Sequence, residues 1–212
     1  MSGSGFRLGL TGALVGLVGA ASAQTPAARP AVPETRRYAI EVAGVRVGTM
    51  TATRVPQTAT TDAVSTLTSD VKVNFLIYKL KIYYQVVNRV RNGQLLLSTV
   101  EAHTNQGDFA SRTEWKGDHY DIVASQYRYQ HRATEKQPIR YTVTDLFFGE
   151  PQGQARAFSE YFGDFFSVQR LGPARYTAGL PDREGEYRYV NGELVLLITK
   201  NPLKNFVIRF LP

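Results

Sequence analysis

Residues 86–100 read VVNRVRNGQLLLSTV, and this stretch decides the fold class. Its two runs of alternating polar and apolar residues flank Asn92-Gly93, a dipeptide that supplies the positive φ angles of a two-residue type I′ hairpin turn. Asn191-Gly192 has the same setting, between EYRYV and ELVLLI. A period of two residues dominates the chain from Arg37 onward, and turn residues recur at hairpin spacing. The sequence therefore predicts antiparallel hairpins.

The register of the central hairpins follows from counting outward from three turns, at 92–93, 105–107 and 117–118. The predicted pairs are Val90–Leu95, Val86–Thr99, Tyr84–Glu101, Ile82–His103, Thr99–Thr113, Leu97–Trp115, Trp115–Tyr120 and Thr113–Ile122. In this register four strands place their apolar side chains on one face, which a one-residue slip would send to water. The alternation changes phase near Tyr78, where a bulge or tight bend is expected.

These features predict an all-β fold, an antiparallel meander of long hairpins that closes into a barrel or half-barrel. The best candidate for a short helix lies around residues 144–149. Since the chain has 212 residues, we expect a single β domain over residues 37–212. It follows a tether, residues 24–36, which is rich in Pro and Ala and unsuited to a helix or a central strand.

Residues 1–23 have the three-part layout of a secretory signal peptide. Arg7 precedes an apolar run, and Ala21-Ser22-Ala23 predicts cleavage before Gln24. The alternative is a membrane-spanning helix, but the run is shorter than the roughly 20 apolar residues that a span requires and is diluted by glycine. We expect an exported protein, periplasmic or associated with the cell envelope, whose mature chain has no transmembrane span.

Composition and motifs exclude several classes of chemistry. The chain has no Cys, which rules out disulfides, thiol catalysis and Cys-ligated metals. The sequence has no nucleophile elbow, zinc-protease motif, phosphate-binding loop or dinucleotide-binding loop. Its histidines, His103, His119 and His131, are interpreted as structural residues and not as metal ligands. We therefore expect no cofactor, no metal site and no enzymatic activity.

One polar group on the expected inner face is the candidate ligand-binding site. Glu101 and His103 would lie inside an apolar barrel mouth, where they could anchor a ligand head group. They are also the only pair that we would test for acid–base catalysis. The full set of candidate residues is Tyr84, Glu101, His103, Ser111, Thr113 and Trp115. The alternative is that this end of the hairpin leaves the core and meets water.

The excess of 25 Lys and Arg over 18 Asp and Glu suggests a basic outer face. Export makes nucleic acid an unsuitable partner, whereas an anionic lipid or glycolipid surface would attract such a face. An ordinary solvated face is the simpler interpretation.

Several stretches resemble a known family, the secreted proteins of domain of unknown function 6134. They are RYAIEVAGVRVGTMTATR, YQVVNRVRNGQLLLSTVEAHTNQGD, TEWKGDHYDI, FSEYFGDFF and EYRYVNGELVLLI. The resemblance implies an exported, antiparallel β domain and brings no functional residues. More distantly the chain is similar to lipocalin-like and lipoprotein-carrier-like proteins, which hold hydrophobic ligands in a curved sheet.

Two functions are therefore expected from different classes. The first is binding of a hydrophobic or amphiphilic ligand in the cell envelope. The alternative is a non-enzymatic envelope interaction or assembly protein with a filled core, which acts through its basic outer face.

Overall fold

A computed structural model describes residues 32–75, 78–126, 129–181, 183–199 and 205–212. These residues form fourteen strands and one short 3-10 helix, η1. The elements are β1 (Glu34–Val42), β2 (Val45–Val55), β3 (Ala63–Phe75), β4 (Tyr78–Arg91), β5 (Gln94–Thr104), β6 (Gly107–Trp115), β7 (Tyr120–Gln126), β8 (Tyr129–Glu135), η1 (Val143–Phe147), β9 (Arg156–Ser159), β10 (Asp164–Gly172), β11 (Arg175–Leu180), β12 (Arg183–Val190), β13 (Glu193–Thr199) and β14 (Phe206–Leu211).

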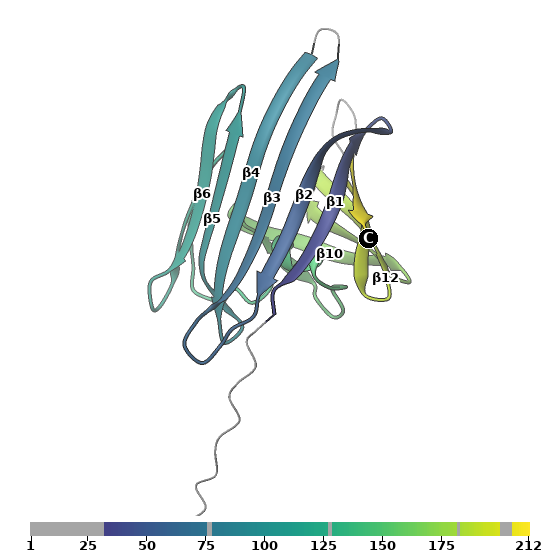
Figure 1. Cartoon of the computed structure of the whole chain (residues 1–212). Coiled ribbons are helices and arrows are strands. Elements are labelled where there is room, and N and C mark those ends of the chain that lie inside the picture. Colours follow the sequence, from purple (N-terminus) through teal and green to yellow (C-terminus); the bar gives the residue numbers. More distant parts are fainter. Residues whose placement is uncertain (1–31, 76–77, 127–128, 182, 200–204) are drawn as a thin grey trace, which may run out of the picture. The chain divides into compact units, whose positions relative to one another are not determined.

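The strands belong to one antiparallel sheet, in the order β8-β7-β6-β5-β4-β3-β2-β1-β14-β13-β12-β11-β10-β9. This confirms the all-β meander (Figure 1). The first and last strands, β1 and β14, pair in the middle of the sheet. The strands at its two ends, β8 and β9, do not pair with each other, so the sheet is an open barrel.

The start of the β domain differs from the expected boundary. The predicted signal peptide and the tether up to residue 31 lie outside the described residues. β1 begins at Glu34, inside the predicted tether, because Glu34–Arg36 pair with residues 52–54 of β2. Residues 31–212 form one compact unit.

The predicted hairpin turns are confirmed. Asn92 and Gly93 have φ angles of 51° and 72°, and Asn191 and Gly192 have angles of 51° and 80°. Two consecutive positive φ angles define a type I′ turn, whose twist matches that of the flanking strands.

The predicted register beyond the Asn92-Gly93 turn is wrong by one residue. Val90 faces Leu95 as expected, but a bulge between Arg89 and Val90 places an extra residue in β5. The observed partners are therefore Val86–Val100, Tyr84–Ala102 and Ile82–Thr104. Because the side chains of a strand alternate between faces, the bulge exchanges the inner and outer residues of most of β5.

The next connection is also one residue shorter than predicted. Thr104 pairs with Gly107, so the turn holds two residues instead of three. Thr113 consequently faces Ser98 and not Thr99, and Leu97 faces Glu114 and not Trp115. The β6–β7 register is as predicted, with Trp115 opposite Tyr120 and Thr113 opposite Ile122.

The change of phase near Tyr78 marks a hairpin. β3 ends at Phe75 and β4 begins at Tyr78, and these two residues face each other. Two residues separate the paired ends, so odd-numbered residues of β3 face even-numbered residues of β4. Side chains that point inward are therefore odd-numbered on β3 and even-numbered on β4. The reversal from β3 to its antiparallel partner β4, and not a bulge within one strand, therefore accounts for the break in alternation.

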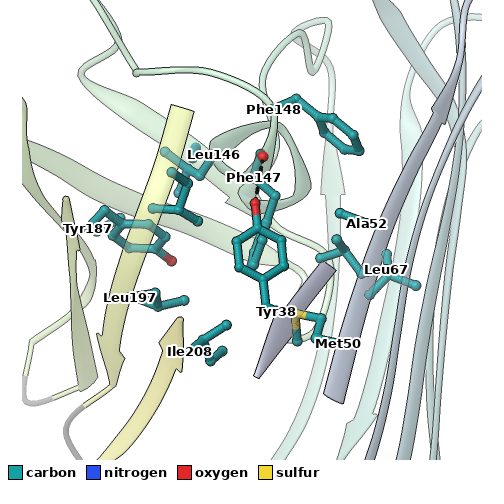
Figure 2. Packing of buried hydrophobic residues seen from close by; sticks show 14 of the residues in the cluster. Tyr38, Met50, Ala52, Leu67, Leu146, Phe147, Phe148, Tyr187, Leu197 and Ile208 are labelled. Atoms are coloured by element: carbon teal, nitrogen blue, oxygen red, sulfur yellow. Dashed lines mark hydrogen bonds between the residues drawn. The ribbon is translucent and has the colours of Figure 1, made fainter. Parts of the chain in front are cut away.

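The interior of the curled sheet is filled. One buried cluster combines inward residues of both halves of the sheet with Leu146, Phe147 and Phe148, which come from η1 and its end (Figure 2). Leu146 is fully buried. The short helix expected around 144–149 is thus present at 143–147 and acts as an internal plug.

Three buried tyrosine hydroxyls attach the interior segment of residues 139–148, which includes η1, to the sheet. Tyr38 donates to the carbonyl of Phe147 at 3.2 Å, as drawn in Figure 2, and Tyr189 donates to that of Leu146 at 2.9 Å. Tyr120 donates to a carbonyl of β5 at 2.7 Å and accepts the N–H of Ile139 at 3.1 Å. Burial raises the pKa of Tyr38 to about 12, so its hydroxyl remains a donor at neutral pH.

Candidate functional site

The predicted pair of Glu101 and His103 does not lie inside the barrel. Both residues are exposed on the outer face of β5, because the bulge at the start of the hairpin reversed their orientation. The Nδ1 atom of His103 lies 2.9 Å from a carboxylate oxygen of Asp108, and its ring stacks on Tyr83 at 5.9 Å. This pair therefore supplies no internal anchor for a ligand.

Two other predicted residues meet at Tyr161. Tyr84 is half-buried on β4, and its ring lies 6.1 Å from that of Tyr161. Ser111 is buried and donates to the carbonyl of Tyr161 at 2.8 Å, while it accepts the side-chain amide of Gln126 at 2.8 Å. These contacts attach the β9–β10 turn to the inner face of the sheet.

The remaining predicted residues lie elsewhere on β6. Thr113 is buried at 1% exposure, and Trp115 is half-buried against Tyr120 at 4.7 Å between ring centroids. The structure therefore separates the six predicted residues into two exposed outer-face residues and four packed inner-face residues. They do not form one pocket.

A buried carboxylate that the sequence analysis missed lies in the interior. Glu160 is 3% exposed. Its Oε1 atom accepts the side-chain amide of Asn88 at 2.7 Å and the backbone N–H of Thr144 at 3.1 Å. Desolvation raises the pKa of Glu160, although these hydrogen bonds oppose the effect. Glu160 directly follows β9, so its carboxyl group connects the end of β9 to β4 and to η1. Its only sequence signal is an acidic residue within the aromatic run FSEYF.

A second polar contact holds the start of η1. Asp145 accepts the backbone N–H of Thr142 at 2.8 Å, which forms a capping box, and its carboxylate pairs with Arg54 at 2.5 Å. The guanidinium carbon of Arg54 lies 4.0 Å from the ring centroid of Phe148. These interactions fix the plug between the two halves of the sheet, so we assign them a structural role.

The candidate binding site is a pocket of about 540 Å³ beside the loop at residues 149–155. Its lining comes from that loop and from one end of β10 and β11. The lining residues are Glu150, Pro151, Gln152, Gly153, Gln154, Ala155, Val168, Arg170 and Tyr176. The size lies within the usual range for small-molecule sites, roughly 300–1,000 Å³.

Backbone contacts place the loop against the sheet. Glu150 donates its N–H to the carbonyl of Gly192 at 3.2 Å, and Val168 donates to the carbonyl of Ala155 at 2.9 Å. Gly153 has a φ of 73°, which an L side chain rarely adopts, and follows Pro151 in the turn. Pro and Gly are common turn residues, but they give no sign of a pocket.

The polar groups of the pocket meet around one phenol. Tyr176 donates its hydroxyl to a carboxylate oxygen of Glu150 at 2.7 Å, and this hydrogen bond raises the pKa of the phenol. Arg170 donates its Nε–H to the carbonyl of Gly172 at 3.2 Å, and its terminal N–H groups make no hydrogen bond to a described residue. Buried Val168 adds an apolar wall. The pocket thus combines a carboxylate, a guanidinium and amides with apolar surface.

Among the described residues, three carboxylates of the outer surface are each held by two cations. Asp62 binds two arginines of β4, Glu114 binds Arg112 and Lys116, and Glu186 binds Arg175 and Arg188. Hydrogen bonds from these cations lower the pKa of all three carboxyl groups. Each cluster retains one excess positive charge. Glu101 and Asp121 are exposed as well, and Asp121 faces Glu114 across β6 and β7, so the outer face is mixed in charge.

The described residues contain neither a cluster of metal ligands nor a helix suited to cross a membrane. No three His, Asp or Glu side chains there lie close enough together to hold a metal ion. No helix of the described part of the chain has the length and hydropathy that a membrane crossing requires.

Comparison with a solved structure supports the fold. The crystal structure of a beta-barrel-like protein of domain of unknown function DUF1849 from Brucella abortus is similar, with a TM-score of 0.53 and 8% sequence identity. The similarity covers 85% of this chain and 96% of the other. At this identity the similarity shows a common fold and nothing more. No curated protein matches the chain.

The family model described as Domain of unknown function (DUF6134) matches residues 38–210, which run from the middle of β1 to the end of β14. This match covers almost the whole sheet and agrees with the family resemblance seen in the sequence. The chain belongs to the DUF6134 family.

Proposed function

We propose that this protein is a non-enzymatic, exported binding protein of the cell envelope, and that it holds an amphiphilic ligand in the pocket beside residues 149–155. The leader-like sequence of residues 1–23 supports export. The observation that carries the binding proposal is the pocket itself, where the polar groups of Glu150, Arg170 and Tyr176 converge beside Val168.

An amphiphilic ligand suits this lining better than a purely hydrophobic one. Inside the sheet, η1 and its aromatic neighbours pack against the inward apolar side chains and occupy the space that a long hydrocarbon chain would need. At the pocket, by contrast, polar groups can orient a head group while Val168 and Ala155 contact an apolar portion. A few placed polar groups within an apolar setting are typical of small-molecule sites.

Native mass spectrometry of residues 24–212, exported in its own envelope and purified gently, tests the proposal. We expect a discrete excess mass that is extracted by organic solvent. Ala155→Phe places a ring in the pocket lining and should remove this mass. Ala110→Phe places the same ring on the exposed outer face of β6 and is the matched control. A clean apo mass for the unmodified chain, or equal loss in both variants, would contradict the proposal.

The filled core supports a second candidate, an envelope interaction protein that works through its outer face. In this case the three cation-rich clusters would contact an anionic lipid or glycolipid surface. We expect binding to anionic vesicles that is lost at about 1 M salt, where the Debye length falls to about 3 Å. Binding that is unchanged at that salt concentration would exclude the electrostatic version.

A further inference from the structure

The two ends of the sheet differ in how their outer edges are covered. At the β9 end, Phe158 donates its backbone N–H to the carbonyl of Tyr141 at 2.9 Å, and Thr142 forms a parallel bridge to Phe158. At the other end, β8 pairs with β7 from Tyr129 to Glu135 without a bulge. No described residue pairs with the opposite edge of β8. Such an edge presents N–H and C=O groups that can pair with another strand.

The backbone groups on this open edge can be assigned from the hairpin geometry. Gln126 faces Tyr129 with two residues between them, so these two residues exchange hydrogen bonds. Along an antiparallel pair, every second position of β8 then bonds to β7. The N–H and C=O groups of Gln130, Arg132 and Thr134 therefore point away from β7.

The side chains of β8 include charges without ion-pair partners among the described residues. Arg132 is exposed on the outer face, and His131 and Glu135 are half-buried on the inner face. The carboxylate of Glu135 accepts only the neighbouring backbone N–H of Gln137, at 2.7 Å. β8 is regular, its outer edge has no partner strand among the described residues, and it carries charged side chains on both faces. Such an edge is suited to a partner strand with complementary charges.

We propose that β8 pairs antiparallel with β8 of a second copy of this chain, with Ala133 opposite Ala133 of the second copy. This inference is independent of the proposed pocket. The register keeps inner residues on the inner face and places His131 opposite Glu135 of the second copy, twice by symmetry. It also lets Arg132 and Thr134 exchange their outward backbone hydrogen bonds between copies.

Other two-fold registers are less favourable. A register centred on Arg132 places two guanidinium groups directly opposite each other, and one centred on Thr134 places Arg132 opposite Lys136. Like charges at directly opposed positions destabilise a strand pair. A register centred on His131 gives neither Arg132 nor Glu135 an oppositely charged partner. Charge complementarity thus favours Ala133.

Sedimentation velocity of the full mature chain over a range of concentrations tests this proposal. We expect a monomer–dimer equilibrium for the unmodified protein. Thr134→Pro removes an outward N–H while the bonds to β7 remain, and should weaken the dimer at least roughly tenfold, which corresponds to 1.4 kcal/mol. Thr134→Val keeps the N–H and is the matched control. Circular dichroism confirms that each variant is folded.

A charge exchange tests the register by itself. Glu135→Arg should weaken the dimer, and adding His131→Glu should restore it, because a carboxylate at position 131 then faces a guanidinium at position 135 of the second copy. A monomer at all concentrations would overturn the proposal, as would a dimer unaffected by Thr134→Pro. Failure of the charge exchange in a folded double variant would overturn the Ala133 register. A monomer that captures a different chain through β8 would overturn the second copy as its occupant.

Discussion

Removing the three tyrosine hydroxyls that hold the interior segment, one at a time, is expected to give three different losses of stability. Tyr→Phe deletes one oxygen and leaves the ring, so packing changes little. Tyr38, Tyr120 and Tyr189 are all buried, at 0%, 0% and 4% exposure. Burial alone therefore does not separate them, whereas their hydrogen-bond partners do.

The order follows from what each deletion leaves behind. The carbonyl of Phe147 also accepts Arg36 at 3.1 Å, so Tyr38→Phe leaves it satisfied and should cost about 0.5–1.5 kcal/mol. The carbonyl of Leu146 has no second donor among the described residues. Tyr189→Phe leaves that carbonyl buried and unpaired, which costs about 1–3 kcal/mol. Tyr120→Phe removes two hydrogen bonds and should cost about 2–4 kcal/mol.

Urea unfolding followed by circular dichroism measures these differences, provided that the slope of the transition is unchanged among variants. The control is Tyr83→Phe, because this ring lies on the outer face and its hydroxyl makes no hydrogen bond to a described residue. We expect no change in its midpoint beyond experimental error. A loss for Tyr38→Phe equal to that for Tyr120→Phe would refute the reasoning from partners.

Three further predictions concern the interior and the turns. Burial raises the pKa of Glu160, so the stability from its neutral form is present at low pH and lost as the pH rises through that raised pKa. Glu160→Gln stays neutral, so its urea midpoint should fall less than that of the unmodified protein as the pH rises from acidic to alkaline. An equal fall in both proteins would contradict this prediction. Gly163→Ala should destabilise by at least about 1 kcal/mol more than Gly44→Ala: both have positive φ, but only the first places a Cβ 2.6 Å from Ile122. Leu146→Ala should lower the free energy of unfolding by about 2–5 kcal/mol. Leu171 of β10 is 51% exposed, so Leu171→Ala should change the free energy of unfolding little.

The fold class could be predicted from local signals. Asn92-Gly93 and Asn191-Gly192 fix two hairpins, because few other dipeptides adopt two positive φ angles at low cost. The inner face of β7, with Tyr120 and Ile122, also followed from simple alternation. These features depend on residues close together in sequence, which explains why they were predicted correctly.

The candidate site could not be predicted in this way. One bulge beside Val90 reversed the faces of Glu101 and His103, and no residue type at that position announces an extra residue. The burial of Glu160 and the pocket at Glu150 depend on contacts between distant segments, such as the bond from Asn88 on β4. Long-range packing of this kind leaves no periodic signal in a single sequence.

The pairing of β1 with β14 in the middle of the sheet has a consequence for the order of assembly. If the chain were joined at its ends and opened between β8 and β9, its strands would follow one another across the sheet without interruption. In the natural chain, the two halves can form hairpins early, but they join only when the last strand meets the first, with Arg37 opposite Leu211. Closing so long a loop is slow, and until it closes the facing edges of β1 and β14 remain exposed. We therefore expect a circular permutant that begins near β9 to refold faster than the natural chain while it keeps the same sheet.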